Sequence, residues 1–242
     1  KYYEYYPDRQ VFMIKNYIND LAEGESKTFH EDGKLASRGY YEADYLKGAY
    51  QEYSETGKIS LIGYYSGGKN SERDSVWTTY HENGVVESEV MYKNGKREGN
   101  FTAFYANKKL LTQGQFHQDE ATGKWVNYYP NGQIWAVGLY KEDQKQGLWK
   151  IYNEAGILEE QGNYLNNEQS GEWRYYTIEK KGSYLAEKGN FENGKALGIS
   201  YFATNFHFLV SVPYKIDKCL RTSDSVAGKI LVLEIKDLPA GA

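Results

Sequence analysis

The sequence predicts an all-β protein: an elongated single-layer antiparallel meander of tandem 24-residue β-hairpins, with a small C-terminal β cap. Three observations predict this fold class. One motif recurs at a fixed spacing along most of the 242 residues, each copy carries turn motifs, and the segments between turns are rich in Tyr, Trp, Val and Ile without a helical period. Short segments of this composition, bounded by turns, are typical of β-strands.

The repeat is defined by the residue that opens each unit, taken here as position 0. Successive openings are 24 residues apart, except for two intervals of 27. The opening residues are Gly24, Gly48, Ser75, Gly99, Gly123, Gly147, Gly171 and Gly198. A period this regular predicts a solenoid-like array in which each unit contacts only its neighbours.

Other positions of the unit are equally regular. Position 2 holds four of the five tryptophans. In the units opened by residues 24 to 147, position 9 is a turn glycine except at Lys108, position 15 is a glycine except at Val90, and position 17 is Tyr or Phe. In the unit opened by Gly171 these residues recur about three places later, as Gly182, Gly189 and Phe191. Position 5 is aromatic in every full unit: Phe29, Tyr53, Tyr80, Phe104, Tyr128, Tyr152 and Tyr176. The regular columns predict two aromatic stripes that run along the array.

Asn-Gly and Asp-Gly pairs divide the chain into hairpins. Asn131-Gly132 lies inside a unit, whereas Asn94-Gly95 and Asn193-Gly194 lie between units. Because these dipeptides supply the two positive φ angles of a type I′ turn, we expect a two-residue loop at each of them.

This turn placement sets a register. It pairs Trp125 with Gly138, Gly138 with Gly147, and Gly147 with Tyr164, so that aromatic rings flank and cover bare glycines. Positions 2, 11 and 17 are expected on one face of the sheet and position 5 on the other. About 15 or 16 strands at ~4.8 Å spacing would give a ribbon on the order of 70 to 80 Å long.

We divide the chain into residues 1–198, an array of one truncated and seven full repeats, and residues 199–242, a C-terminal β cap. Two strands are expected in the cap, at Tyr201–Tyr214 and Lys229–Leu238, and a small interaction or anchoring module is the alternative. The two three-residue insertions, within 66–74 and 177–183, are expected as longer loops on opposite long edges.

The unit G-x-W-x-x-Y-x-x-N-G-x-[LIV]-x-x-x-G-x-Y resembles the MORN repeat, and more closely its bacterial variant. The match is carried by Gly123, Trp125, Tyr128, Asn131, Gly132, Ile134, Gly138 and Tyr140, and it extends over about residues 1–198. The resemblance implies scaffolding, dimerisation or phospholipid contact, as in eukaryotic MORN proteins, or an antitoxin, immunity or cell-envelope role, as in bacterial ones. We expect no enzyme activity, because no Ser-His-Asp or Cys-His arrangement can be placed in the repeat pattern.

The composition limits the kinds of partner and the compartment that we expect. The net charge is -4 and the basic residues are scattered, which argues against nucleic acid and anionic membranes as main partners. The single cysteine, Cys219, excludes an intramolecular disulfide. No stretch approaches the roughly 18 apolar residues of a membrane span. Since the chain starts at Lys1 rather than Met, we expect a removed leader and a periplasmic or cell-surface location, with the cytoplasm as alternative.

Catalytic, metal and cofactor sites are not expected. His30 and His81 share position 6 two units apart, too far for one metal ion, and are expected as solvated strand-end residues. Residues 63–70, GYYSGGKN, approach a phosphate-binding loop but lack its Ser or Thr and the following helix.

We therefore expect a protein–protein interaction scaffold that is an accessory component of a bacterial cell-envelope complex. The alternatives are an immunity protein that blocks a toxin and a carbohydrate-binding protein. A single-layer sheet leaves one aromatic stripe partly open, and Tyr and Trp are enriched in interface hot spots. The predicted contact residues are Tyr53, Tyr80, Tyr128, Tyr152 and Trp135.

Overall fold

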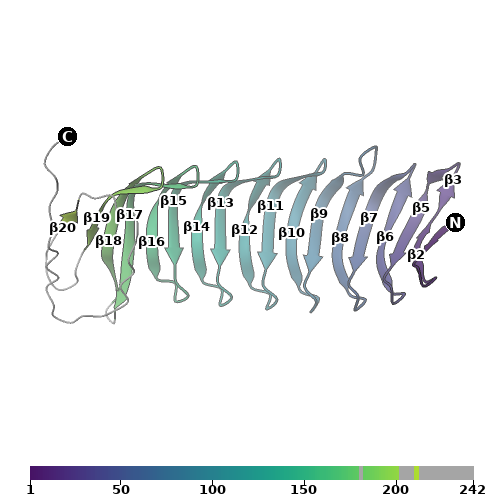
Figure 1. Ribbon diagram of the computed structural model, residues 1–242, viewed down its shortest axis with the longest axis horizontal. Helices are drawn as coiled ribbons and strands as arrows, with labels where there is room; N and C mark the ends of the chain where they lie inside the picture. The colour runs from purple at the N-terminus through teal and green to yellow at the C-terminus, as the bar shows by residue number, and fades with distance from the viewer. Residues whose placement is uncertain (180–181, 202–209, 213–242) are drawn as a thin grey trace.

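The computed structural model describes residues 1–179, 182–201 and 210–212 and shows one long, single-layer sheet (Figure 1). Within the described residues, 18 strands pair antiparallel in chain order, from the N-terminal β1 to β20, and a separate two-stranded hairpin is formed by β3 and β4. The strands are β1 (Tyr2–Tyr5), β2 (Val11–Lys15), β3 (Tyr17–Ile18), β4 (Leu21–Ala22), β5 (Gly24–Phe29), β6 (Leu35–Glu42), β7 (Tyr45–Tyr53), β8 (Ile59–Ser66), β9 (Arg73–Tyr80), β10 (Val86–Lys93), β11 (Lys96–Phe104), β12 (Leu110–His117), β13 (Glu120–Tyr128), β14 (Ile134–Lys141), β15 (Gln144–Tyr152), β16 (Leu158–Leu165), β17 (Glu168–Glu179), β18 (Gly182–Glu192), β19 (Lys195–Tyr201) and β20 (Val210–Val212). The predicted meander of tandem hairpins is confirmed.

The tryptophan column pairs with the glycine column as expected. Trp125 lies opposite Gly138, Trp149 opposite Gly162 and Trp173 opposite Gly189. The tryptophan ring that covers each glycine, however, comes from the next unit: Trp149 occupies the space where Gly138 would carry a Cβ. A register shift between Val137 and Leu139 brings the Trp149 ring into this position.

The opening glycine has a different role from the predicted one. Gly147 pairs with Tyr164, as expected, but its φ is +60° and it lies where the register between β14 and β15 shifts. A Cβ on Gly147 would meet only Leu139 Cδ1, at 3.8 Å. It is therefore needed for its left-handed backbone rather than to make room for a ring, and the predicted face-to-face pair with Gly138 is wrong.

The core is a row of alternating rings on the tryptophan face of the sheet. Trp125, Tyr140, Trp149, Tyr164 and Trp173 follow one another in edge-to-face contacts, with ring centroids 5.0 to 6.0 Å apart. The three tryptophans of this run are at most 9% exposed. Edge-to-face pairs of buried rings are a favoured arrangement, so this row supplies most of the apolar packing that a single-layer sheet has.

The turns follow two designs. Between units, Asn94 and Gly95 have φ angles of 51° and 77°, and Glu142 and Asp143 of 52° and 62°, as type I′ turns require. Inside units the loop has three residues: only Gly132 has a positive φ, and the Gly132 N–H donates to the Tyr129 carbonyl at 2.8 Å. This is a type I turn followed by a left-handed residue, so the two-residue loop predicted at Asn131-Gly132 is wrong.

The longer loop changes which face position 11 occupies. Ile134 pairs with Tyr128, and the register then shifts so that Asn127 pairs with Ala136. Trp135 is the extra residue of this bulge. Because directly opposed residues share a face, position 11 lies with position 5 and not with the tryptophans, which corrects the predicted assignment.

Both long edges carry hydrogen bonds between units. On one edge, the Asp143 Oδ1 atom accepts from the Ala121 N–H at 2.6 Å, and the Asp143 N–H donates to the Ala121 carbonyl at 3.2 Å. On the other, the Tyr129 hydroxyl donates to the Tyr152 carbonyl at 2.9 Å. His30 and His81 make the same contact through Nε2 and are half-buried, so they belong to this edge rather than being solvated.

The two insertions differ in structure. Residues 66–74 form a longer turn, in which the Ser71 hydroxyl accepts from the Leu46 N–H at 2.7 Å. The second insertion instead lengthens β17 and β18, which still pair at Glu179 and Gly182. The expected strand at Lys229–Leu238 lies outside the described residues, and of Tyr201–Tyr214 only Tyr201 and residues 210–212 are described.

Candidate partner-binding face

The face opposite the tryptophans, here called the open face, exposes large apolar side chains. They stand at positions 1 and 16 of the unit and are 41 to 52% exposed. We call this set the apolar row: Tyr40, Tyr64, Val76, Met91, Leu139 and Leu148. Within it, Met91 lies directly opposite Val76 on the neighbouring strand. The row has two parts, Tyr40 to Met91 and Leu139 with Leu148, because the same positions of β11, β12 and β13 hold the polar residues Asn100, Gln115 and Lys124. Exposed apolar patches rimmed by polar side chains are typical of binding surfaces.

The predicted contact tyrosines lie on the open face but beside the apolar row. Tyr53, Tyr80, Tyr128 and Tyr152 are all half-buried. The Tyr53 hydroxyl donates to Gln51 Oε1 and the Tyr128 hydroxyl accepts from Gln113 Nε2, each at 3.0 Å. Two of these tyrosines thus have hydroxyls already bonded within the sheet, and all four remain predicted contact residues.

Trp135 differs from these tyrosines. It is the extra residue of a bulge in β14 and is 40% exposed, whereas the four tryptophans of position 2 are buried. Its predicted place in the site remains a prediction.

The apolar row was missed by the sequence analysis, although a signal for it was present. Position 16 alternates with the glycine of position 15 and the ring of position 17, so it must point to the opposite face. Tyr40, Tyr64, Met91 and Leu139 occupy this position. Position 5, which is aromatic in every full unit, was predicted as the contact position instead, although its tyrosines are half-buried.

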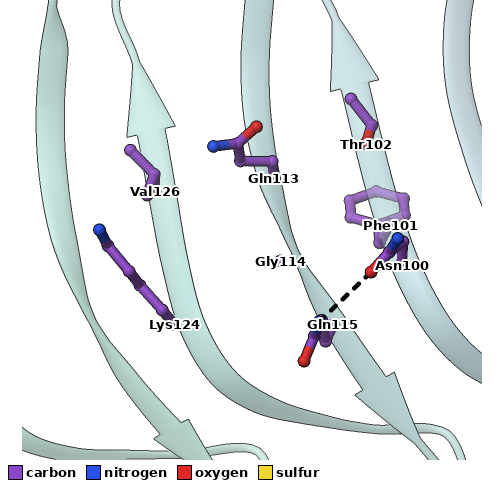
Figure 2. A pocket seen from close by; sticks show the side chains of 8 residues that line it. All are labelled: Asn100, Phe101, Thr102, Gln113, Gly114, Gln115, Lys124 and Val126. Atoms are coloured by element: carbon purple, nitrogen blue, oxygen red, sulfur yellow. Dashed lines mark hydrogen bonds between the residues drawn. The ribbon is translucent and has the colours of Figure 1, made fainter.

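The open face has one hollow of about 380 Å³ over β11, β12 and β13 (Figure 2). Polar side chains line it, among them Asn100, Gln113 and Gln115, and the Gln115 Nε2 atom donates to Asn100 Oδ1 at 3.3 Å. Phe101 also borders it, but the Phe101 ring packs against Phe116 and Trp125 on the tryptophan face. The hollow therefore presents amides without an aromatic platform.

A second hollow, of about 310 Å³, lies over β13, β14 and β15. Leu139, Leu148 and Tyr152 form its apolar part, and Lys124 and Lys150 add two ammonium groups. Lys124 borders both hollows. Here the apolar row, a predicted contact tyrosine and basic charge come together.

Comparison with known protein families identifies the repeat. The model described as "MORN repeat variant" matches residues 22–43, 73–94, 97–118, 121–142 and 145–166. The chain is a MORN-repeat protein. A comparison with curated proteins gave no match at a significant level.

The ionisable groups of this MORN-repeat protein fit a structural role. Burial is the main cause that raises the pKa of the Tyr50 hydroxyl to about 12, and burial also raises the pKa of Tyr140 and Tyr164. The pKa of the Glu98 carboxyl is lowered, first by the hydrogen bond from the Gln118 backbone N–H and second by that from His117. The hydrogen bond from Arg174 lowers the pKa of the Glu172 carboxyl. These shifts come from ring packing and surface pairing rather than from a cluster of interacting acids and bases.

The described residues form neither a metal site nor a membrane-spanning helix. No group of three or more His, Cys, Asp or Glu side chains is placed to hold a metal ion in the described part of the chain. Nor do the described residues include a helix long and apolar enough to cross a membrane.

Proposed function

We propose that this MORN-repeat protein is a non-enzymatic scaffold that binds a protein partner through its open face. The observation that carries the proposal is the apolar row, whose members stay 41 to 52% exposed while the rings of the other face pack on one another. The rings on the tryptophan face pack on one another and do not cover the apolar row, which lies on the opposite face. The row is therefore available for a partner.

The family supports the coarse form of this proposal. MORN repeats often act as modules that bind protein or lipid. A long sheet whose units contact only their neighbours also offers an extended binding surface without requiring a deep pocket.

We further propose that the scaffold is an extracytoplasmic, accessory component of a bacterial cell-envelope complex. This finer assignment rests on the resemblance to bacterial MORN variants. An immunity protein would instead bind one toxin and should be encoded beside the toxin gene. A carbohydrate-binding protein should give hits on a glycan array, although the amide hollow lacks the aromatic platform on which sugars stack.

Affinity purification of the full chain from its native cells tests the proposal. The wild type is compared with the double variant Leu139→Asp/Leu148→Asp and with the control Ile18→Asp. Ile18 is 60% exposed and lies in the separate β3–β4 hairpin, outside the long sheet and its open face. We expect mass spectrometry to find a set of proteins retained by the wild type and the control and lost with the double variant. Equal retention by all three forms would remove the open face from the proposal.

A further inference from the structure

We infer that the hollow over β13, β14 and β15 binds an acidic peptide segment in which an apolar side chain is flanked by carboxylates. The apolar side chain contacts Leu139 and Leu148, and the carboxylates pair with Lys124 and Lys150. This inference rests on the proposed function, since it specifies the chemistry of the partner at one place on the open face.

The hollow combines apolar and basic groups on one surface. Leu139 and Leu148 are 47% and 49% exposed, and Tyr152 and Val137 complete the apolar lining. Lys124 is paired with Leu139 in the register of β13 and β14, and Lys150 is paired with Val137 in that of β14 and β15. The two lysines therefore stand on opposite sides of β14.

Their separation follows from sheet geometry. Two strands at ~4.8 Å spacing and a two-residue offset along the strand place the lysine Cα atoms about 12 Å apart. An extended peptide advances ~3.3 Å per residue and its side chains alternate between two faces, so carboxylates four residues apart share a face and match this spacing. The residue between them lies over the leucines.

Lys150 differs from the two other basic residues at position 3 of the unit, Lys27 and Arg174. At position 3, Lys27 Nζ pairs with Glu25 Oε2 at 2.8 Å, and Arg174 Nε pairs with Glu172 Oε1 at 2.7 Å. In both cases the acid stands two residues earlier in the same strand, at position 1. In the repeat opened by Gly147, position 1 is Leu148, so one substitution both exposes apolar surface and leaves the Lys150 ammonium without that acid.

The Lys124 ammonium group is also available to pair with a carboxylate of the peptide. Neither Lys124 nor Lys150 forms an ion pair or side-chain hydrogen bond with another residue of the described chain. Lys124 is exposed and borders the amide hollow, whose Asn100, Gln113 and Gln115 side chains can bond a peptide backbone that continues across β12. The basic charge of the hollow thus comes from two single ammonium groups with no ion pair among the described residues.

A peptide fits this arrangement better than an anionic membrane does. The chain has a net charge of -4, and the two lysines flank a recessed apolar patch instead of forming a broad basic surface. Membrane attraction needs several basic residues at one surface, each adding about 1 kcal/mol. The two ammonium groups can instead pair with two carboxylates of a peptide, while the apolar patch between them contacts an apolar side chain of the same peptide.

Selection of a random peptide display library on the full chain tests the inference. We expect enriched sequences with Asp or Glu on both sides of a Leu, Ile, Phe or Trp. Synthetic peptides from the selection should bind about fivefold more weakly to Lys124→Gln or Lys150→Gln, as expected for partly exposed charge pairs. Enrichment without acidic residues would overturn the inference.

Leu148→Glu is the matched variant. It recreates the acid that precedes Lys27 and Arg174 in the same strand positions, so it should fold as the wild type does and melt at the same temperature. We expect it to weaken peptide binding about tenfold or more, because it removes a leucine and supplies Lys150 with an internal partner. Unchanged peptide binding would contradict the inference.

Two further outcomes separate this inference from the proposed function. If the native partner is lost with Leu139→Asp/Leu148→Asp but retained by Lys124→Gln/Lys150→Gln, the scaffold function stands and the acidic peptide is wrong. Binding to vesicles with 30% phosphatidylserine that is lost in the lysine double variant, without peptide selection, would assign the hollow to a membrane surface instead.

Discussion

Trp149 lies flat over Gly138, with its ring atoms in the space that a Cβ would need. The ring belongs to the unit after that of the glycine, and the Trp149 Nε1–H donates to the Leu139 carbonyl at 3.2 Å. The same contact recurs between Trp125 and Gly114 and between Trp173 and Gly162. At each of these contacts a repeat is held to its predecessor by a ring that needs a glycine beneath it, whereas the unit opened by Ser75 has Val90 at this position and is followed by Phe101.

The substitution Gly138→Ala tests the packing of the Trp149 ring on Gly138. The added methyl group must displace the Trp149 ring, so we expect a loss of about 3 kcal/mol or more in the free energy of unfolding. Gly147→Ala is the control, since its Cβ meets only Leu139 at 3.8 Å and its cost is the strain of a left-handed φ, about 1 kcal/mol. Urea unfolding followed by tryptophan fluorescence measures both. Equal losses would show that the ring contact is unimportant.

Lys108 offers a stabilising substitution. It has a φ of 69° at the turn position that glycine occupies in the neighbouring units, for example Gly132. We expect Lys108→Gly to raise the free energy of unfolding by about 1 kcal/mol, because it relieves left-handed strain. In the control Lys109→Gly, the hydrogen bond from Nζ to the Asn131 carbonyl is lost and no strain is relieved, so stability should fall. A loss in both variants would contradict the turn assignment.

Asp143 tests the hydrogen bonds between units at the long edge. Asp143→Ala removes the acceptor of the Ala121 N–H and also places alanine at a left-handed φ of 62°, so it should cost about 2 kcal/mol. Asp143→Asn should have little effect, because Asn167 makes the same bond to the Lys145 N–H at 2.7 Å. Thermal unfolding of the two variants distinguishes a hydrogen bond from a charge effect. If Asn were as harmful as Ala, charge would be the cause.

The half-buried tyrosines of the tryptophan face predict instability in alkaline solution. Because the pKa of Tyr50 is raised to about 12, its neutral form is favoured in the folded protein. The stability it contributes is complete below the unfolded pKa of about 10 and is lost as the pH rises from there towards 12. Burial of Tyr140 and Tyr164 acts in the same direction. Urea midpoints measured between about pH 9 and about pH 12 should fall, and less steeply in Tyr50→Phe. A midpoint that stays constant would refute this.

The regular columns of the sequence were enough to predict the repeat, the meander and the Trp125–Gly138 pairing. The predicted loop length and the predicted face of position 11 were wrong, because both depend on backbone geometry at the turn. Asn131-Gly132 forms the end of a three-residue loop, since the Gly132 N–H bonds to the Tyr129 carbonyl and only Gly132 is left-handed. The resulting bulge moves position 11 to the open face, and a period-2 count along the strand cannot foresee it.

The candidate site was predicted only in part. The open face was expected, but exposure depends on packing across strands, which a single-strand pattern does not contain. Tyr128 is half-buried and bonded to Gln113, whereas Leu139 on the neighbouring strand is 47% exposed. Tyr152 is the predicted contact residue that borders a hollow with the apolar row.

Site-specific photo-cross-linking in the native cell tests the central claim most directly. A photoreactive amino acid replaces Leu139 or Met91 in the apolar row, or Ala155, which is exposed in the turn between β15 and β16. The account predicts that both row positions cross-link to the same protein and that Ala155 does not. Cross-links from Ala155 alone, or none from Met91 and Leu139, would contradict a protein-binding role for the open face.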